Sequence, residues 1–192
     1  MPQALDLGSH DMVALSRASI GALRTALERD ASGSAAAYLQ EAGYAGGDPQ
    51  FESFRAWLAE RHGGDPETID VGYFAPLISD YFRETGWGTL SLGSLGQVAA
   101  LDSHDWREAD PAAGLDHPAC HLSTGIFAAF FGRLAGQELA VFEVECRSAG
   151  AEQCRWLVGS PEMLEHLFGA MEHGAGYAEA LGLHAGQGAS PE

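Results

Sequence analysis

The stretch CHLSTGIFAAFFGRLAGQELAVFEVECRSAGAEQC, residues 120–154, decides the fold, because it holds all three cysteines of the chain. They stand at its two ends and in its second half, as Cys120, Cys146 and Cys154. Three thiols cannot all pair with one another as disulfides, and an odd cluster of cysteines in a reducing compartment favours a metal site. Three buried free cysteines that pack as small hydrophobes remain the alternative.

The same stretch predicts one helix followed by a β-hairpin. Residues 122–134 are apolar nearly all round, which is typical of a helix that is buried or lines a cavity. Residues 138–146 and 154–158 have the composition of strands, with Gly150 at the turn between them. Cys146 and Cys154 would then lie at the two ends of the hairpin loop, where their sulfurs can converge.

Cys120 would reach the same point from the start of the helix, where the helix dipole favours a thiolate. A tetrahedral zinc site needs a fourth ligand, and Cys3His sites are commoner than sites with a carboxylate. Chemistry alone therefore favours a histidine over the nearby glutamate. The candidates close by in sequence are His117, His121 and Glu143.

The bulk composition predicts one domain that binds no nucleic acid. A chain of 192 residues with 46% hydrophobic residues can bury one sizeable core, so we expect a single domain at 1–172 and a flexible tail at 173–192. The net charge is −17, and all ten basic residues are arginine. Phosphate backbones and anionic membrane surfaces would repel such a surface.

Neither a secretory signal nor a membrane span is predicted. The first fifteen residues have no basic segment followed by an apolar one. The longest apolar run, Ile126 to Phe131, is far shorter than a bilayer span. We expect a cytoplasmic protein.

The N-terminal half predicts four helices. The first would start at Ser9 and bury Leu23 while Arg24 faces solvent. The second would cover 35–42 and end at Gly43, with AGYAGGDP, residues 42–49, as a turn before a third helix that has Pro49 in its first turn. A fourth pattern runs through 74–82.

The remaining elements indicate an α+β fold. Residues 86–92 and 97–101 predict paired antiparallel strands across the turn GSLG. Ser160 followed by Pro161 predicts the N-terminus of a last helix.

The order Cys120, Glu143, Cys146 and Cys154, within TGIFAAFFGRLAG and VFEVECRSAGAEQCRW, resembles the 4-vinyl reductase domain family. That family includes the sensor domains of phenol- and xylene-responsive transcription activators and proteins linked to bacteriochlorophyll synthesis. The resemblance extends through AGYAGG and GWGTLSL, over about residues 10–170. No ligand position departs from the family pattern. It implies that these four residues hold Zn2+, with Glu143 as the fourth ligand.

Four protein ligands would close the site, so the implied zinc is structural and staples the C-terminal hairpin to the helix. Three thiolates and a carboxylate leave the site negative. Backbone N–H donors, or Arg147 and Arg155, would have to neutralise this negative charge.

The resemblance also implies an antiparallel sheet with helices packed on it, a homodimer, and a pocket for a small hydrophobic molecule between sheet and helices. Each candidate lining residue could equally fill an ordinary core. Polar side chains that would fix a phenolic hydroxyl are not evident, so we expect an apolar or larger ligand, such as an aromatic, lipid-like or tetrapyrrole molecule. The lining candidates are Trp87, Trp106, Phe127, Phe130, Phe131 and Val141.

Three functions follow from the resemblance. The chain could be a sensor or delivery module, an enzyme or accessory factor of tetrapyrrole synthesis, or a scaffold resembling vesicle-tethering subunits. No nicotinamide or flavin fingerprint is present, and the metal would occupy all three thiols, so we expect no enzyme. The sensor module is the interpretation we favour.

Overall fold

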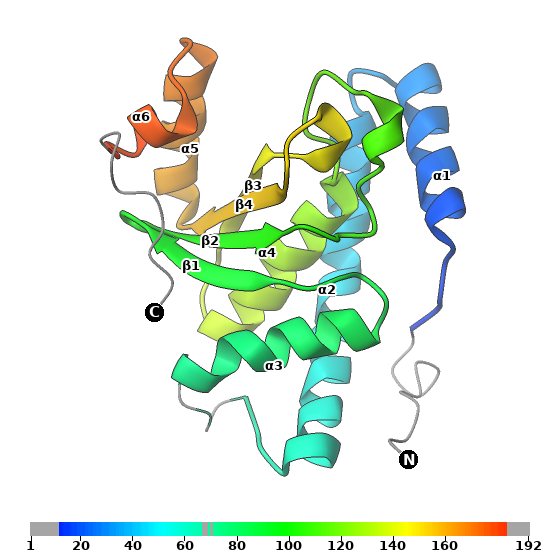
Figure 1. The fold of residues 1–192 in the computed structure, drawn as a ribbon, viewed down its shortest axis with the longest axis vertical. Helices are drawn as coiled ribbons and strands as arrows, with labels where there is room; N and C mark the ends of the chain where they lie inside the picture. The colour runs from blue at the N-terminus through cyan, green and yellow to red at the C-terminus, as the bar shows by residue number, and fades with distance from the viewer. Residues whose placement is uncertain (1–11, 67–68, 70, 184–192) are drawn as a thin grey trace.

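The computed structural model describes residues 12–66, 69 and 71–183. Its centre is a four-stranded antiparallel sheet in the order β1-β2-β4-β3 (Figure 1). This α+β arrangement confirms the predicted fold class. The strands are β1 (Ser91–Leu95), β2 (Val98–Ser103), β3 (Ala140–Glu145) and β4 (Cys154–Gly159).

Helices cover both faces of the sheet. One face packs on α2 (Ala35–His62), α3 (Val71–Glu84) and α4 (His121–Ala135). The other packs on α5 (Pro161–Glu172) and α6 (Tyr177–Ala180). The fold is completed by α1 (Arg17–Asp30) and by the 3-10 turns η2 (Pro111–Ala113) and η3 (Arg147–Ala149). Among the described helices, none combines the length and the apolar character that crossing a membrane requires.

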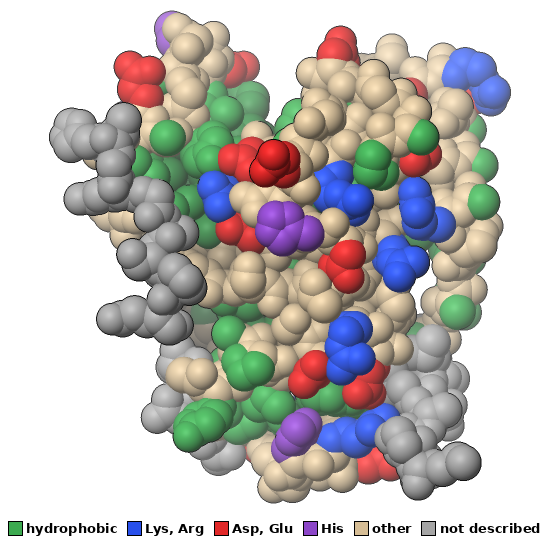
Figure 2. Space-filling view, in the orientation of Figure 1, with side chains coloured by type: hydrophobic (Ala, Val, Ile, Leu, Met, Phe, Trp, Pro, Cys, Tyr) green, Lys and Arg blue, Asp and Glu red, His purple; other side chains and the backbone are tan. Residues whose placement is uncertain are grey.

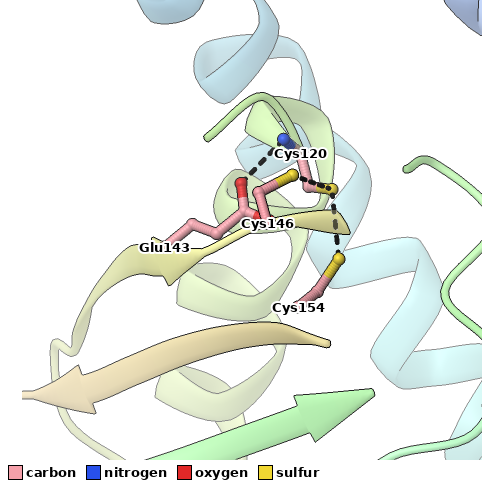
Figure 3. Close-up of side chains that lie close together, drawn as sticks. All are labelled: Cys120, Glu143, Cys146 and Cys154. Carbon is pink, nitrogen blue, oxygen red and sulfur yellow. Dashed lines mark hydrogen bonds between the residues drawn. The ribbon is translucent and has the colours of Figure 1, made fainter. Parts of the chain in front are cut away.

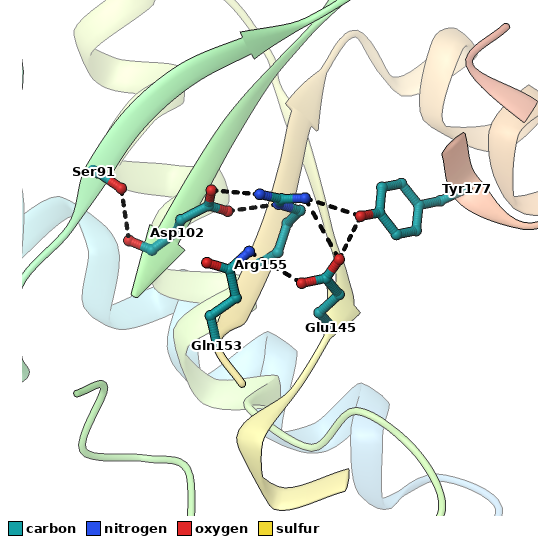
Figure 4. Close-up of polar contacts among 6 residues, drawn as sticks. All are labelled: Ser91, Asp102, Glu145, Gln153, Arg155 and Tyr177. Carbon is teal, nitrogen blue, oxygen red and sulfur yellow. Dashed lines mark hydrogen bonds and ion pairs between the residues drawn. The ribbon is translucent and has the colours of Figure 1, made fainter. Parts of the chain in front are cut away.

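Strand alternation separates the two faces. Trp156 and Val158 point into the larger core with α4, whereas Leu157 points to α5. Arg155 also lies on the α5 side, where it forms two hydrogen bonds of 2.7 Å with Asp102 and one of 2.9 Å with the Tyr177 hydroxyl (Figure 4). The sheet is therefore a wall between an aromatic core and a smaller C-terminal cluster.

The predicted break in the second helix is wrong, because α2 runs unbroken through Gly43, Gly47 and Pro49. Its glycines serve close packing instead of a turn. A Cβ on Gly43 would lie 2.0 Å from the backbone oxygen of Leu122 in α4, and one on Gly47 would lie 2.3 Å from the Ala129 Cβ. The absence of these side chains lets the two helix backbones approach each other, and that contact overrides the local turn propensity.

The first helix also differs from its prediction. It begins at Arg17, with the Ser16 side chain accepting a hydrogen bond from the Ser19 backbone N–H. Residues 9–11 of the predicted helix lie outside the described residues. The predicted burial is wrong at two positions, since Leu23 is 51% exposed and Arg24 is buried.

The first two strands pair as predicted, but their turn lies later. GSLG is mostly within β1, and the chain reverses at Gly96, which has a φ of 61°. Residues 173–183, which we predicted to belong to a flexible tail, include α6, whose Tyr177 is bonded to Arg155. Residues 184–192 lie outside the described residues.

Candidate metal centre

Four predicted side chains meet at the junction of α4 with the C-terminal hairpin (Figure 3). Cys120 is the N-cap residue of α4, Cys146 follows β3 directly, and Cys154 begins β4. Glu143 reaches the same point from within β3. All four are buried, and their ligand atoms lie within 4.8 Å of one another.

The sulfur positions match those of a tetrahedral thiolate site. Cys120 Sγ lies 3.7 Å from Cys146 Sγ and 3.9 Å from Cys154 Sγ. Two thiolates bound to one tetrahedral ion at about 2.3 Å stand about 3.8 Å apart. A disulfide would need an Sγ–Sγ distance of about 2 Å. The three cysteines are therefore free thiols, arranged at the spacing of metal ligands.

Glu143 provides an oxygen that no protein group satisfies. Its Oε2 accepts a hydrogen bond of 2.8 Å from the Cys120 backbone N–H, whereas the buried Oε1 has no hydrogen-bond partner in the described structure. An unpartnered carboxylate oxygen in the interior costs several kcal/mol unless a cation or donor meets it. The three thiols and this carboxylate therefore form, within the described residues, a set of ligand atoms that suits a cation.

A β-bulge follows Glu143 in β3. In the pairing of β3 with β4, Glu143 lies opposite Trp156 and Glu145 lies opposite Arg155, so Val144 is an extra residue. Regular alternation from Val141 already puts Glu143 on the α4 side of the sheet, and the bulge turns Glu145 to the α5 side.

Without a cation, the four acidic groups could not all ionise. Burial and the neighbouring Cys146 raise the pKa of Glu143 to about 9. Hydrogen bonds with the two other thiols raise the pKa of Cys120, and hydrogen bonds with Cys120 and Cys154 lower the pKa of Cys146. The group therefore concentrates its negative charge on one thiol, and a divalent cation would let the others ionise.

Backbone donors supply part of the predicted outer shell. The Ala119 and Arg147 backbone N–H groups donate to Cys146 and Cys154 respectively. Arg155, which we expected as an alternative to the backbone donors, does not contribute to the site. Strand alternation puts its side chain on the opposite face from Cys154.

The two histidines favoured by chemistry alone do not join the group. His117 is exposed and its Nδ1 lies 2.6 Å from Asp116 Oδ1. His121 is half-buried, and burial lowers its pKa. The carboxylate implied by the family resemblance lies with the thiols instead.

Sequence reasoning missed the residue that secures the start of α4. Glu108 is buried and accepts hydrogen bonds from the backbone N–H groups of Leu122 and Ser123, at 3.0 and 2.8 Å, and from the Ser123 hydroxyl. The Trp106 Nε1 donates to that hydroxyl at 2.7 Å. Glu108 thus caps the helix from a distant loop, and its only sequence signal is an acidic residue close to a tryptophan.

The six predicted lining residues lie together in the aromatic core between sheet and helices. Trp106 and Phe127 have ring centroids 5.1 Å apart, and Trp156, which sequence reasoning missed, is 5.1 Å from Phe127. The Trp156 Nε1 is buried with no hydrogen-bond partner among the described residues. Two hollows that the structure describes are lined by other residues, one of about 120 Å³ beside Phe51 and one along α1.

Comparisons with known proteins agree with this architecture. Residues 104–160 match the family model of the 4-vinyl reductase domain, which confirms the resemblance over that part of the chain. No curated protein sequence matches.

Two solved structures share the fold. The phenol-responsive sensory domain of the transcription activator PoxR, solved with phenol, has a TM-score of 0.57 at 18% identity, and the match covers 84% of this chain and 82% of that one. A vinyl-4-reductase family protein from Methanocaldococcus jannaschii has a TM-score of 0.51 at 14% identity, covering 80% and 88%. Identities this low show similarity of fold alone.

Proposed function

We propose that this chain, whose residues 104–160 match the 4-vinyl reductase domain, is a zinc-stabilised module that binds a small hydrophobic ligand and signals or delivers it as a homodimer in the cytoplasm. The observation that carries the proposal is the fold of a phenol-responsive sensory domain with a buried Cys3Glu group at its hairpin. The metal would hold the fold, and the aromatic core would hold the ligand.

Zinc is the metal that suits this donor set best. Thiolates are soft ligands that Mg2+ and Ca2+ do not prefer, and three thiolates with one further ligand are typical of structural zinc. Cys120, Glu143, Cys146 and Cys154 would hold the ion and leave no position for a substrate. The metal's chemical contribution is thus to join β3, β4 and α4, and the ligand must bind elsewhere.

The ligand region we propose is the aromatic core on the α4 side of the sheet. The ring centroids of Phe130 and Phe131 lie 5.2 Å apart in this core, beside Trp106 and Phe127. Trp87 and Val141 pack at the edge of the core. The unpartnered Trp156 Nε1 supports a ligand that offers one hydrogen-bond acceptor to an otherwise apolar site. A ligand would enter by separating these rings.

Native mass spectrometry of the purified protein, compared with the denatured protein, tests metal, stoichiometry and ligand together. We expect one zinc ion per chain, a dimer mass, and an organic mass that is released on denaturation. A chain without zinc would contradict the metal assignment. A large stable complex with no releasable molecule would favour the scaffold function instead.

A matched pair of variants tests the position of the ligand. Phe130 is fully buried in the proposed site, so Phe130→Trp should block uptake of naphthalene, measured by calorimetry, while zinc stays bound. The control is Phe168→Trp, at a 45% exposed ring on α5. Equal uptake by both variants would show that the ligand does not bind among these rings.

A further inference from the structure

Two buried polar atoms of the sheet have no hydrogen-bond partner, and their residues face each other across two strands. The Trp156 Nε1 on β4 and the Glu143 Oε1 on β3 are both buried and unpaired in the described structure. Trp156 and Glu143 are direct partners in the antiparallel pairing of β3 with β4. Burial without a partner costs each group the free energy of its lost hydration, so this donor and this acceptor both need an explanation.

Both side chains point to the same face of the sheet. Trp156 belongs to the larger core with α4, and Glu143 reaches the thiols at the start of that helix (Figure 3). The Cβ atoms of directly opposed residues lie about 4.5–5.5 Å apart, so an indole and a carboxylate attached to them are within reach of each other. The two unpaired atoms could therefore satisfy each other.

The aromatic neighbours of Trp156 offer it no acceptor. Its ring centroid lies 5.1 Å from that of Phe127 and 5.6 Å from that of Trp106, and neither ring carries a hydrogen-bond acceptor atom. The Trp106 Nε1 already donates to Ser123. Beside these rings, the Trp156 N–H can pair with the Glu143 carboxylate or with a molecule that enters the aromatic core.

Glu143 has the same choice between an internal and an external partner. Its Oε2 accepts from the Cys120 backbone N–H at 2.8 Å, so Oε1 is the oxygen left for a new partner. That partner is either a cation among the thiols or the Trp156 N–H. In the observed arrangement the carboxylate lies with the thiols and leaves the Trp156 N–H unpaired.

We propose that Trp156 couples the metal site to the ligand site, because Glu143 pairs either with a cation, leaving the Trp156 N–H for the ligand, or with Trp156 itself. This inference rests on the proposed function, since it takes the aromatic core as the ligand site. Pairing of Glu143 with Trp156 would deprive both sites of a polar group. A cation and a ligand together would satisfy both atoms, so the two sites should fill together.

The free donor also selects the class of ligand. An aromatic carbonyl compound offers an oxygen that accepts one hydrogen bond and brings no donor of its own. A hydroxyl group would bring a donor that needs a second acceptor, and the cation would already occupy the Glu143 carboxylate. The ligand class that suits the Trp156 N–H best is therefore an aromatic ketone, aldehyde or quinone.

An apolar ligand can meet the protein beside α3. Hydrophobic side chains reach the surface around this helix (Figure 2), and the Tyr73 ring on it is 71% exposed. The buried side chains of α3 and of Trp156 share one hydrophobic core. An aromatic body can therefore approach over hydrophobic surface before its carbonyl group reaches the indole.

The indole N–H signals of a 1H–15N spectrum test the pairing directly. The chain has four tryptophans, so four such signals are expected, and Trp156 is assigned from its contact with Phe127. Zinc is removed from the reduced protein at a temperature below the melt of the zinc-free form. The Trp156 proton should then move downfield, because it now bonds to Glu143. The signal of Trp57, which donates to Glu84, should keep its position.

Two probes of similar shape test the coupling, 2-acetylnaphthalene with a carbonyl group and 2-ethylnaphthalene without one. The zinc-loaded protein should bind the ketone about fivefold more tightly, since one hydrogen bond is gained. The zinc-free protein should bind the two probes alike. Because coupling is reciprocal, the ketone should raise the affinity for zinc more than the hydrocarbon does, measured by competition with a chelating dye.

A matched pair of variants isolates the donor. Trp156→Phe keeps a ring without the N–H, so the zinc-loaded variant should bind the two probes alike. Trp57→Phe also removes a buried indole, at a position outside the proposed ligand site, and should keep the preference for the ketone. If Trp156→Phe does not fold, the wild-type spectra and affinities decide.

The possible failures are distinguishable. If neither probe binds to the zinc-loaded wild type, the proposed ligand site is wrong and this inference falls with it. If both probes bind equally well to the zinc-loaded wild type, or if the Trp156 signal does not move when zinc is removed, the coupling is wrong while the proposed function stands.

Discussion

Glu143 and Glu145 stand two positions apart on one strand, yet they serve opposite faces of the sheet. On a regular strand they would share a face. Regular alternation keeps Glu143 with the thiols, and the bulge at Val144 moves Glu145 to the other face. There Glu145 accepts a hydrogen bond of 3.1 Å from Gln153 and pairs with Arg155 (Figure 4). At the scale of single residues, one inserted position keeps the second carboxylate, Glu145, away from the metal site.

Glu108 should make the stability of the protein depend on pH. Burial raises its pKa from 4.5 to about 7, despite three hydrogen-bond donors. The folded state therefore retains a proton that the unfolded chain releases, so the free energy of unfolding should fall as pH rises from about 4.5 to about 7. The loss is about 3 kcal/mol at most, since one pKa unit corresponds to about 1.4 kcal/mol.

Urea unfolding of Glu108→Gln at several pH values measures this contribution. The variant lacks the titrating group, so its stability relative to the wild type should improve as pH rises through that window. Glu60→Gln, at an exposed glutamate on α2, is the matched control. Parallel pH curves for the wild type and Glu108→Gln would contradict the prediction.

At the scale of elements, the contact of α2 with α4 depends on missing side chains. Gly125 on α4 repeats what Gly43 does on α2, since its Cβ would lie 2.0 Å from the Gln40 backbone oxygen. Both obstructions are backbone atoms, which cannot move aside as a flexible side chain can. The helices can approach this closely only because both surfaces carry glycine.

Gly43→Ala should therefore destabilise the protein by about 2 kcal/mol or more, because the new methyl group forces the helices apart. Gly46→Ala on the same helix meets nothing within 4 Å, and replacing a helical glycine should stabilise by about 0.5–1 kcal/mol. Urea unfolding of both variants measures the contrast. Equal effects at the two positions would argue against close packing of α2 on α4.

The packing of α6 against the sheet should depend on the Tyr177 hydroxyl. Tyr177 bonds to both Arg155 and Glu145, and Tyr177→Phe removes these bonds while keeping the ring. We expect a loss of about 1 kcal/mol and faster amide hydrogen exchange at residues 177–180. Tyr73→Phe, at a 71% exposed ring on α3, is the control. Unchanged exchange in Tyr177→Phe would show that the ring alone holds α6.

At the scale of the whole molecule, the Cys3Glu group lies where α4, β3 and β4 converge, and its three cysteines form no disulfide. Cys120 lies at the start of α4 and Cys154 begins β4. Glu143 lies in β3, and Cys146 directly follows that strand. A bound ion would therefore connect the helical layer to the sheet. Its loss would leave four acidic groups buried together without a cation.

Removing the metal should lower the thermal stability of the whole protein. Treating the reduced protein with a strong chelator should cost several kcal/mol, which for a chain of this size corresponds to a fall in Tm of about 10 °C or more. Adding zinc should restore the original melt, and the same chelator saturated with zinc beforehand is the control. A melt that ignores the free chelator would contradict a structural metal.

The sequence by itself determined the unit of helix and hairpin around residues 120–154, the spacing of the cysteines and the Ser160 cap of α5. These are local patterns of apolar periodicity, turn residues and capping, and neighbours along the chain are enough to produce them. The choice of Glu143 over a histidine came from family resemblance, since spacing alone left both open.

The tertiary structure decided what Gly43, Arg24 and Arg155 do. Gly43 lies inside a helix because α4 requires close approach, and Arg155 turns away from the thiols because of strand alternation. Arg24 is buried because it lies on the inward face of α1, with the half-buried Leu27. Each outcome depends on groups distant in sequence. Local propensity is worth about 1 kcal/mol or less per residue, and packing contacts outweigh it.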